Sequence, residues 1–302
     1  MRIIVVAAAL LALQQAPEIK AFPADNPWNW DISKHAVHPN SANFIKSIGA
    51  DDKFHCDFGT EWQGAPNGIP FVIVGGKQKK VPVEFEYADE SDPGPYPIPD
   101  DAPIEGGPKG EGDRHILVID KDNRVLYELY KATKSDKGWK AGSGAIFKLD
   151  SNELRKEGWT SADAAGLPIY PGLVRFDEVA KGAIPHALRF TIQKSQKAYL
   201  WPARHHASRE TDTNLPPMGL RLRLKQSVDI SRFPKCAQVI AQALKTHGMF
   251  VADNGSDWYL SGAPDKRWKD DELHALDKLK GSDFEAVLTV DEKGKPIPPA
   301  KR

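Results

Sequence analysis

The stretch GEGDRHILVIDKDNRVLYELY, from Gly110 to Tyr130, predicts a β-hairpin. Two runs rich in Val, Ile and Tyr flank the polar pair Asp122-Asn123, which is the composition of two strands joined by a turn. A turn centred on that pair fixes the antiparallel register of the two strands. The predicted cross-strand pairs are Asp120 with Val125, Leu117 with Glu128, and His115 with Tyr130.

The two faces of this hairpin differ in chemistry, because side chains two residues apart along a strand project to the same face. One face is predicted to enter a core through Ile116, Val118, Tyr127 and Leu129. The other collects ionisable groups, namely Asp113, His115, Glu128 and Tyr130. A glycosidase needs two carboxyl groups, and a lyase needs a base such as His or Tyr. We therefore predict Asp113, His115 and Glu128 as catalytic residues and Tyr130 as a substrate-binding residue; a solvated, ion-paired sheet face is the alternative.

Composition narrows the class of protein. The chain has 302 residues, of which 40% are hydrophobic, and its 41 acidic residues balance 41 basic ones. This balance argues against nucleic acid or an anionic membrane as a partner. Gly and Pro, at 24 each, indicate many turns and a loop-rich β fold.

The N-terminus is typical of an export signal. Arg2 precedes the unbroken apolar run Ile3 to Leu13, which is too short to span a bilayer. A cut after Ala21 is predicted, so residues 1–21 are the signal peptide. We expect a secreted or periplasmic protein that is a monomer and has no membrane partner.

The rest of the chain predicts short strands, then helices. Strands are expected at Ile69–Val74, Val81–Tyr87, Ala187–Ile192, Ala198–Pro202 and Leu220–Leu224, and a hairpin at Met249–Ala252 and Trp258–Leu260. The segment from Ala88 to Lys109 is too proline-rich for regular strands. Helices are expected at Pro234–His247 and Asp270–Lys280. The predicted fold is mainly β, a β-sandwich or jelly-roll-like single domain over residues 22–290 with two C-terminal α-helices, followed by a flexible tail, 291–302.

Three further residues are candidates for substrate binding. His186 follows Pro185 at the start of a strand and faces either the core or the mouth of a cleft. Arg204 offers a rigid donor fork for a sugar carboxylate, and Asp253 follows a strand at a turn. Adjacent His205 and His206 point to opposite faces of a strand, so no metal site and no cofactor are predicted.

The chain has two cysteines, Cys56 and Cys236. In an oxidising compartment they are predicted to form one disulfide across a long loop, and a buried apolar role for Cys236 is the alternative.

Several longer motifs carry a family resemblance. They are NPWN (26–29), GDRH (112–115), GWTSADAAGLP (158–168), IPHAL (184–188) and WPARH (201–205). Through them, residues 22–287 resemble a large family of exported bacterial proteins with no established activity. The resemblance implies an exported, single-domain, β-rich protein and assigns no catalytic role.

Two functions from different classes fit this sequence. The first is a secreted carbohydrate-active enzyme, a glycoside hydrolase or polysaccharide lyase acting on a poly- or oligosaccharide. Glu128 and Asp113 serve as acid and base in the hydrolase; in the lyase His115 or Tyr130 removes a proton while Arg204 neutralises a sugar carboxylate. The alternative is a non-catalytic glycan- or cell-wall-binding protein. A deep groove lined by the three predicted catalytic residues favours the enzyme, and exposed Trp without a buried carboxylate favours binding.

Overall fold

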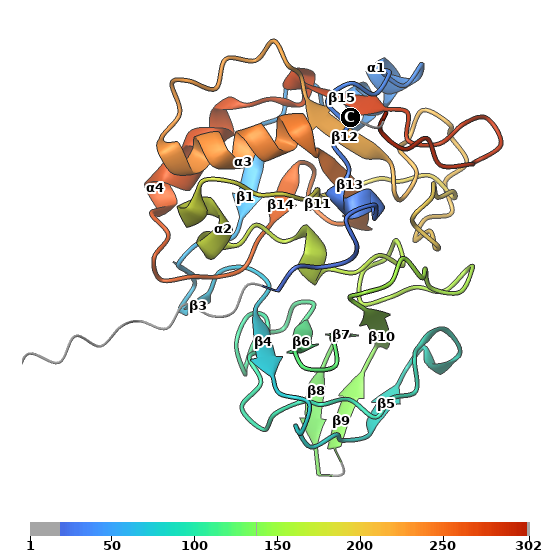
Figure 1. Cartoon of the computed structure of the whole chain (residues 1–302), viewed down its shortest axis with the longest axis vertical. Coiled ribbons are helices and arrows are strands. Elements are labelled where there is room, and N and C mark those ends of the chain that lie inside the picture. The colour runs from blue at the N-terminus through green and yellow to red at the C-terminus, as the bar shows by residue number, and fades with distance from the viewer. Residues whose placement is uncertain (1–18, 137, 301–302) are drawn as a thin grey trace, which may run out of the picture.

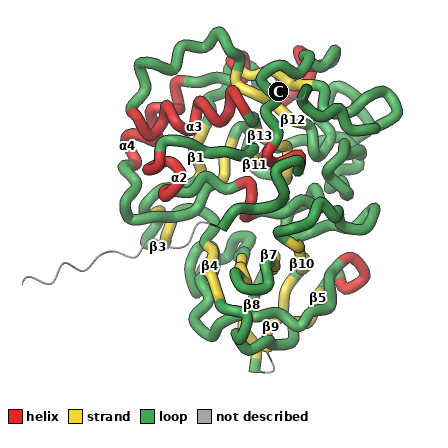
Figure 2. Tube along the Cα trace, viewed as in Figure 1, coloured by secondary structure: helices red, strands yellow, loops and turns green. Residues whose placement is uncertain are grey.

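The computed structural model describes residues 19–136 and 138–300 (Figure 1). Strands outnumber helices, and long loops connect them (Figure 2), so the prediction of a mainly β, loop-rich protein is confirmed. The predicted signal peptide falls almost entirely outside the described residues. None of the helices in the described part of the chain is long and apolar enough to cross a membrane.

The largest sheet mixes parallel and antiparallel pairs. Its order is β1 (His55–Asp57), β14 (Tyr259–Ser261), β11 (Leu188–Ile192), β13 (Met249–Asn254), β12 (Arg221–Leu224) and β15 (Phe284–Val287). The predicted hairpin of 249–252 with 258–260 is wrong, because β11 lies between β13 and β14 and pairs with both. The predicted strand at 198–202 is also wrong, since only an isolated bridge forms there, between Tyr199 and Met218.

A second sheet contains the predicted hairpin of residues 116–130. Its order is β10 (Ser143–Lys148), β7 (Val125–Tyr130), β6 (Ile116–Asp120) and β4 (Phe71–Val74). The register pairs Leu117 with Glu128 and Asp120 with Val125, as predicted. A smaller sheet, β5 (Val83–Phe85), β9 (Gly138–Ala141) and β8 (Thr133–Ser135), and the short pair β2 (Glu61–Trp62) and β3 (Ala65–Pro66) complete the set.

Both faces of the hairpin are buried. Ile116, Val118, Tyr127 and Leu129 enter a small core with Tyr96 and Trp139, so the predicted core face is confirmed. The opposite face, with Leu117, Ile119 and Leu126, packs into the main core of the molecule. His115 and Glu128, on that face, therefore meet protein rather than water.

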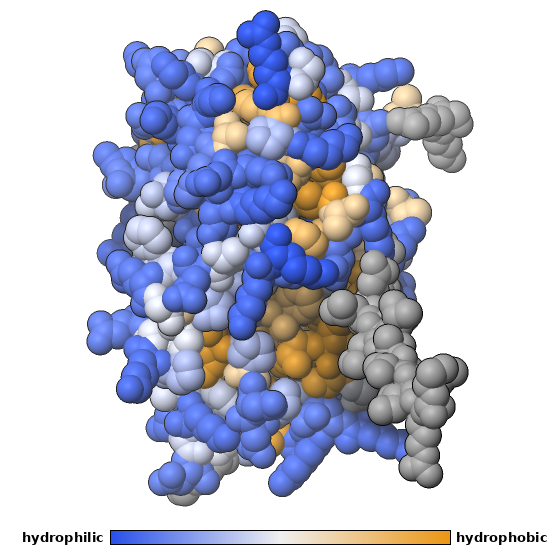
Figure 3. Space-filling model, turned by 90° about the vertical axis from the view of Figure 1, so that its left-hand side faces the viewer, coloured by the Kyte–Doolittle hydropathy of each residue, from blue (hydrophilic) through white to orange (hydrophobic). Residues whose placement is uncertain are grey.

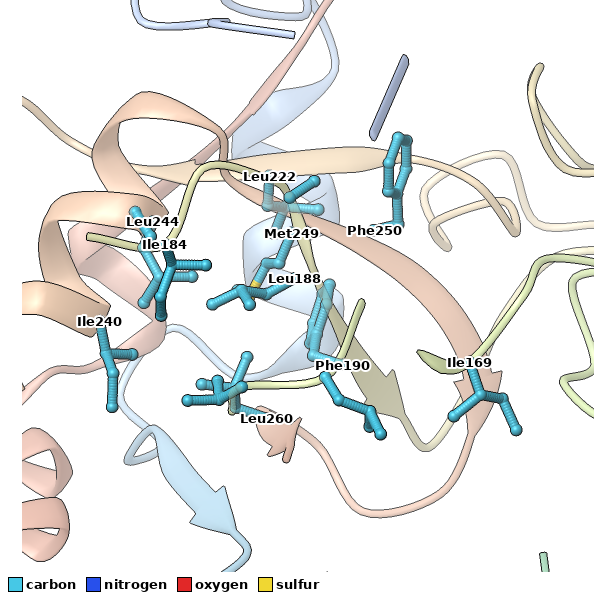
Figure 4. Packing of buried hydrophobic residues seen from close by; sticks show 14 of the residues in the cluster. Ile169, Ile184, Leu188, Phe190, Leu222, Ile240, Leu244, Met249, Phe250 and Leu260 are labelled. Carbon is cyan, nitrogen blue, oxygen red and sulfur yellow. The ribbon is translucent and has the colours of Figure 1, made fainter. Parts of the chain in front are cut away.

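Helices cover the six-stranded sheet (Figure 1). They are α1 (Ser41–Ile48), α2 (Phe176–Lys181), α3 (Lys235–Thr246) and α4 (Asp270–Leu273), the last continued by the 3-10 turn η4 (His274–Lys278). Both predicted C-terminal helical segments are present, although the second is only one α-turn long. Ile240 and Leu244 of α3 pack toward the sheet residues Leu188 and Leu222 (Figure 4).

Arg221 of β12 holds the N-terminal segment in place through hydrogen bonds. Arg221 is fully buried, and it donates hydrogen bonds to the carbonyls of Pro27, Trp30 and His247 while its guanidinium stacks on Phe250 at 4.6 Å. Backbone carbonyls without a regular sheet partner need such donors when they are buried. Arg221 therefore substitutes for secondary structure along a segment that has little of its own.

Two further sequence predictions concern the cysteines and the C-terminal tail. Cys56, buried on β1, and Cys236, half-buried on α3, are free thiols, so the predicted disulfide is not formed. Residues 291–300, predicted as part of a flexible tail, form a turn in which the Ile297 amide donates to the Thr289 carbonyl.

Gly248 gives a stability prediction. It follows α3 with a φ of +66°, and a Cβ added there would lie 2.2 Å from the Leu222 carbonyl oxygen. We expect Gly248→Ala to lower the free energy of unfolding by about 2 kcal/mol or more, because backbone strain and a steric clash act together. Urea unfolding measures the loss. Gly182→Ala is the matched control for strain alone, since Gly182 has a φ of +90° but no atom within 4 Å of the added Cβ.

Candidate functional site

The structure brings predicted residues from the hairpin together with residues of the six-stranded sheet. The resulting interior polar cluster consists of His115, Glu128, Asp163, Arg189 and Asp253. Four of these residues are buried, and Asp253 on β13 is half-buried. The two large sheets therefore meet at a cluster of mostly buried charged side chains, and not at an open cleft.

His115 is held as an imidazolium. Its Nδ1 lies 2.6 Å from Glu105 Oε2 and its Nε2 lies 3.1 Å from the Ala162 carbonyl, so both ring nitrogens face acceptors. Only the protonated ring can donate to both. Burial alone would lower the pKa of His115, but the Glu105 carboxylate raises it to about 9. At neutral pH the ring is therefore charged, and both of its nitrogens are engaged.

Glu128 has no exposed surface and is fixed by backbone amides. It accepts hydrogen bonds from the amides of Ile169, at 3.0 and 2.9 Å, and Tyr170, at 2.8 Å. Burial raises the pKa of Glu128 to about 7, although the same two amides oppose the shift. Protonated and ionised forms are both populated near neutrality.

Asp163 and Arg189 form the fully buried ion pair of the cluster. Arg189 Nε and Nη2 donate to the two carboxylate oxygens of Asp163 at 3.0 and 2.8 Å, in a bidentate arrangement. Nearby, burial and then the Asp163 carboxylate raise the pKa of Asp253 to about 8. Sequence reasoning missed Asp163 and Arg189 as site residues: Asp163 stands in the motif GWTSADAAGLP, to which no chemistry was assigned, and Arg189 stands in a predicted strand.

The cluster predicts how stability depends on pH. The folded-state pKa values of Glu128, Asp253 and His115, about 7, 8 and 9, all lie above the ordinary values of 4.5, 3.8 and 6.5. The folded state therefore retains protons that the unfolded state releases, and each contribution is lost as pH rises toward the folded value. We expect the midpoint of thermal unfolding to fall between pH 5 and pH 9. Asp253→Asn should flatten the part of the curve between pH 4 and pH 8; an unchanged slope would exclude Asp253 as a source.

The remaining predicted residues do not join this cluster as one site. Asp113 is exposed on the loop before β6, and Tyr130 is half-buried with its ring 5.8 Å from that of His115. Arg204 donates to the Arg155 carbonyl and pairs with Glu157 at 2.7 Å near the surface. Asp113 and Glu128 thus do not face each other across a cleft in the way that a pair of glycosidase carboxyl groups requires.

His186 contacts Glu178 and Arg175, which line a second site, a cavity of about 570 Å³ that we name the β4–α2 pocket. This size suits a small ligand. Its apolar walls include Phe71 of β4, Tyr170 and Phe176, together with Pro66, Pro70, Pro103 and Pro264. On the side of the molecule that carries β3, β4 and α2 in Figure 1, the space-filling view shows a hollow lined by hydrophobic residues (Figure 3).

A buried ion-pair network supports one wall of the pocket. Arg175 Nη2 lies 2.6 Å from Glu178 Oε1, and His186 Nε2 lies 3.1 Å from Glu178 Oε2. Burial alone would raise the pKa of Glu178, but Arg175 and His186 lower it to about 2. Arg175 and Glu178 line the pocket directly, whereas His186 contacts Glu178 but is not part of the lining.

Arg267 holds two further carboxylates of the pocket wall. It pairs with Asp177 at 2.8 Å and also with Asp265. Burial alone would raise the pKa of Asp265, but hydrogen bonds from Arg267 lower it. The pocket carboxylates with resolved shifts are therefore both more acidic than usual.

The sequence carries only a weak signal for this pocket. Tyr170, Arg175 and Glu178 stand in a Pro- and Gly-punctuated stretch that ends at the short helix α2, and only His186 was predicted as a site residue. The pocket forms because β4, α2 and the loops beside β2 and β14 converge, which no local pattern indicates.

No set of His, Cys, Asp or Glu side chains within residues 19–136 and 138–300 is arranged to hold a metal ion.

Comparison of the chain with protein-family models, curated proteins and solved structures finds no match, so the resemblance to an exported bacterial family stays a prediction.

Proposed function

We propose that this protein is an exported glycan-binding protein whose binding site is the β4–α2 pocket. The observation that carries the proposal is the combination of aromatic walls with ion-paired polar groups in one cavity, the usual make-up of a ligand site. Aromatic rings provide flat apolar surfaces for the faces of sugar rings, and fixed charged groups provide hydrogen bonds for their hydroxyls.

The charges of the pocket favour a neutral sugar. Its lining contains four acidic side chains, Glu61, Asp177, Glu178 and Asp265, and three basic ones, Arg175, Lys181 and Lys266, a formal balance of −1. An anionic sugar would meet no net attraction there. A neutral oligosaccharide is the ligand class that this balance supports best.

Binding is favoured over acid catalysis in this pocket. A glycosidase keeps one carboxyl group protonated through a raised pKa. The pKa values of Glu178 and Asp265 are instead lowered by their arginine partners, so these groups are ionised at neutral pH and cannot donate a proton.

An exposed tryptophan adds to the proposal. Trp62 is 68% exposed on β2, directly after Glu61, which lines the pocket. Five of the other tryptophans, Trp28, Trp30, Trp139, Trp258 and Trp268, are buried in the core. Trp62 therefore presents an exposed aromatic surface on the short strand that also carries the pocket residue Glu61.

Phe71 provides the test. We expect Phe71→Ala to weaken binding of the preferred oligosaccharide by about 30-fold, since aromatic anchors at the centre of a site contribute about 2 kcal/mol or more. Calorimetric titration against a panel of neutral and acidic oligosaccharides measures the change. Tyr87→Ala is the matched control, because Tyr87 is 42% exposed but does not line the pocket. Equal loss in both variants, or no binding across the panel, would contradict the proposal.

A secreted glycoside hydrolase or lyase on a β-sandwich is the second candidate. It is favoured by the raised pKa values of Glu128 and Asp253, which keep carboxylic acids protonated near neutrality, as a general acid requires. Reducing-end release or unsaturated uronic products on the same panel, abolished by Asp253→Asn, would support it. Binding without turnover would favour the first proposal.

A further inference from the structure

Tyr170 connects the interior polar cluster to the β4–α2 pocket. Glu128 on β7 accepts the amide protons of Ile169 and Tyr170, which begin the 3-10 turn η3 (Tyr170–Gly172). The Tyr170 ring lines the pocket and meets the Phe71 ring edge-on, with ring centroids 5.0 Å apart. Tyr170 thus links the two sites directly: its amide contacts the buried Glu128 carboxyl group, and its ring lines the pocket.

The same turn is held from its other side by Arg175. Arg175 Nη1 donates to the Tyr170 carbonyl at 2.7 Å and to the Leu173 carbonyl at 3.3 Å. Its guanidinium lies over the Tyr170 ring at 4.6 Å and pairs with Glu178. The position of the ring is therefore set by Glu128 at the start of the turn and by Arg175 beyond it.

We propose that Glu128 is a positioning residue for the β4–α2 pocket, which fixes the Tyr170 wall when it is ionised and loosens that wall when it is protonated. This inference rests on the proposed function of the pocket and adds a dependence on pH to it. Glu128 reaches the ligand only through the backbone of η3.

The physical basis is the strength of the three amide contacts. Hydrogen bonds to an ionised carboxylate are roughly twice as strong as those to a neutral group. The charged groups that face Glu128 are His115, next to the start of β6, and Asp163, which is itself paired with Arg189. With the pKa of Glu128 at about 7, the carboxyl group changes charge in the physiological range.

The direct test needs no ligand. In a ¹⁵N-labelled sample of the mature protein, the amide resonances of Ile169 and Tyr170 should shift together between pH 5.5 and 8.5, with one midpoint near pH 7. Glu128→Gln should remove this transition. Glu105→Gln is the matched control, since Glu105 contacts His115 and no residue of η3, and it should keep the transition. Amides that stay unmoved in the unmodified protein would overturn the proposal.

The second arm measures binding. If only the ionised form holds the wall in place, a group titrating near pH 7 makes the affinity for the preferred neutral oligosaccharide about tenfold weaker at pH 6 than at pH 8. Glu128→Gln should be weak at both values. An affinity independent of pH, with titrating amides, would overturn the link to the pocket. No sugar binding at any pH, with titrating amides, would refute the glycan proposal and leave the positioning of Tyr170 by Glu128 established.

Discussion

Arg189→Met is expected to lower the free energy of unfolding by about 3–5 kcal/mol, the cost of removing one partner of a buried ion pair. Asp163 is fully buried and both of its carboxylate oxygens accept from Arg189. Without the guanidinium, the carboxylate must stay charged and unpaired or take up a proton. Its charge would also act more strongly on Asp253, whose pKa it already raises.

A double-substitution cycle separates this pair from general disruption. Asp163→Leu with Arg189→Met leaves no isolated charge, so the double variant should lose much less than the sum of the two single losses. Guanidinium chloride unfolding of the four proteins measures the coupling. Additive losses would show that the two side chains stabilise the protein independently of each other.

Arg221→Met is expected to cost about 3 kcal/mol or more, for a different reason. Arg221 donates its hydrogen bonds to backbone carbonyls, those of Pro27, Trp30 and His247. Methionine fills similar space but donates no hydrogen bond, and hydrogen bonds from a charged group contribute about 1.5–3 kcal/mol each. The His247 carbonyl would lose both of its Arg221 donors, whereas the carbonyls of Pro27 and Trp30 would keep the Trp30 amide and the His247 ring. Burial lowers the pKa of Arg221 to about 9, so removing the guanidinium also removes a desolvation cost, which partly offsets the loss of its hydrogen bonds.

Arg232→Met is the matched control, because Arg232 is exposed and surface substitutions usually change stability by less than about 0.5 kcal/mol. Urea unfolding of the two variants gives the comparison. Limited proteolysis adds a local readout, since the segment near Pro27 and Trp30 should become cleavable in Arg221→Met. Equal stability of both variants would mean that water replaces the guanidinium.

Local pattern was sufficient where an element is defined by its own residues. The hairpin of β6 and β7 has its predicted register because alternation and a polar turn specify which residues face each other. Helix α3 lies where an apolar stripe between Pro234 and Gly248 placed it. The predicted core face of the hairpin is buried for the same reason.

The candidate site depended on what packs against those elements. Alternation placed His115 and Glu128 on one face, but it could not tell whether water, a ligand or protein covers that face. Asp163 and Arg189 arrive from distant segments and convert the predicted open surface into a closed polar interior. The predicted hairpin of β13 and β14 is wrong for a similar reason, because β11 comes from another part of the chain, lies between the two strands and pairs with both.

The sequence by itself determined the mainly β character, the central hairpin with its register, and the identity of several polar residues that have buried roles. Tertiary structure alone decided that Glu128 supports a neighbouring pocket through η3, that His186 braces Glu178, and that both faces of the hairpin are covered. The physical reason is the distance along the chain between the residues that interact. Strand register and helical stripes follow from neighbouring residues, whereas burial, pKa and cavity shape follow from contacts between segments far apart in the chain.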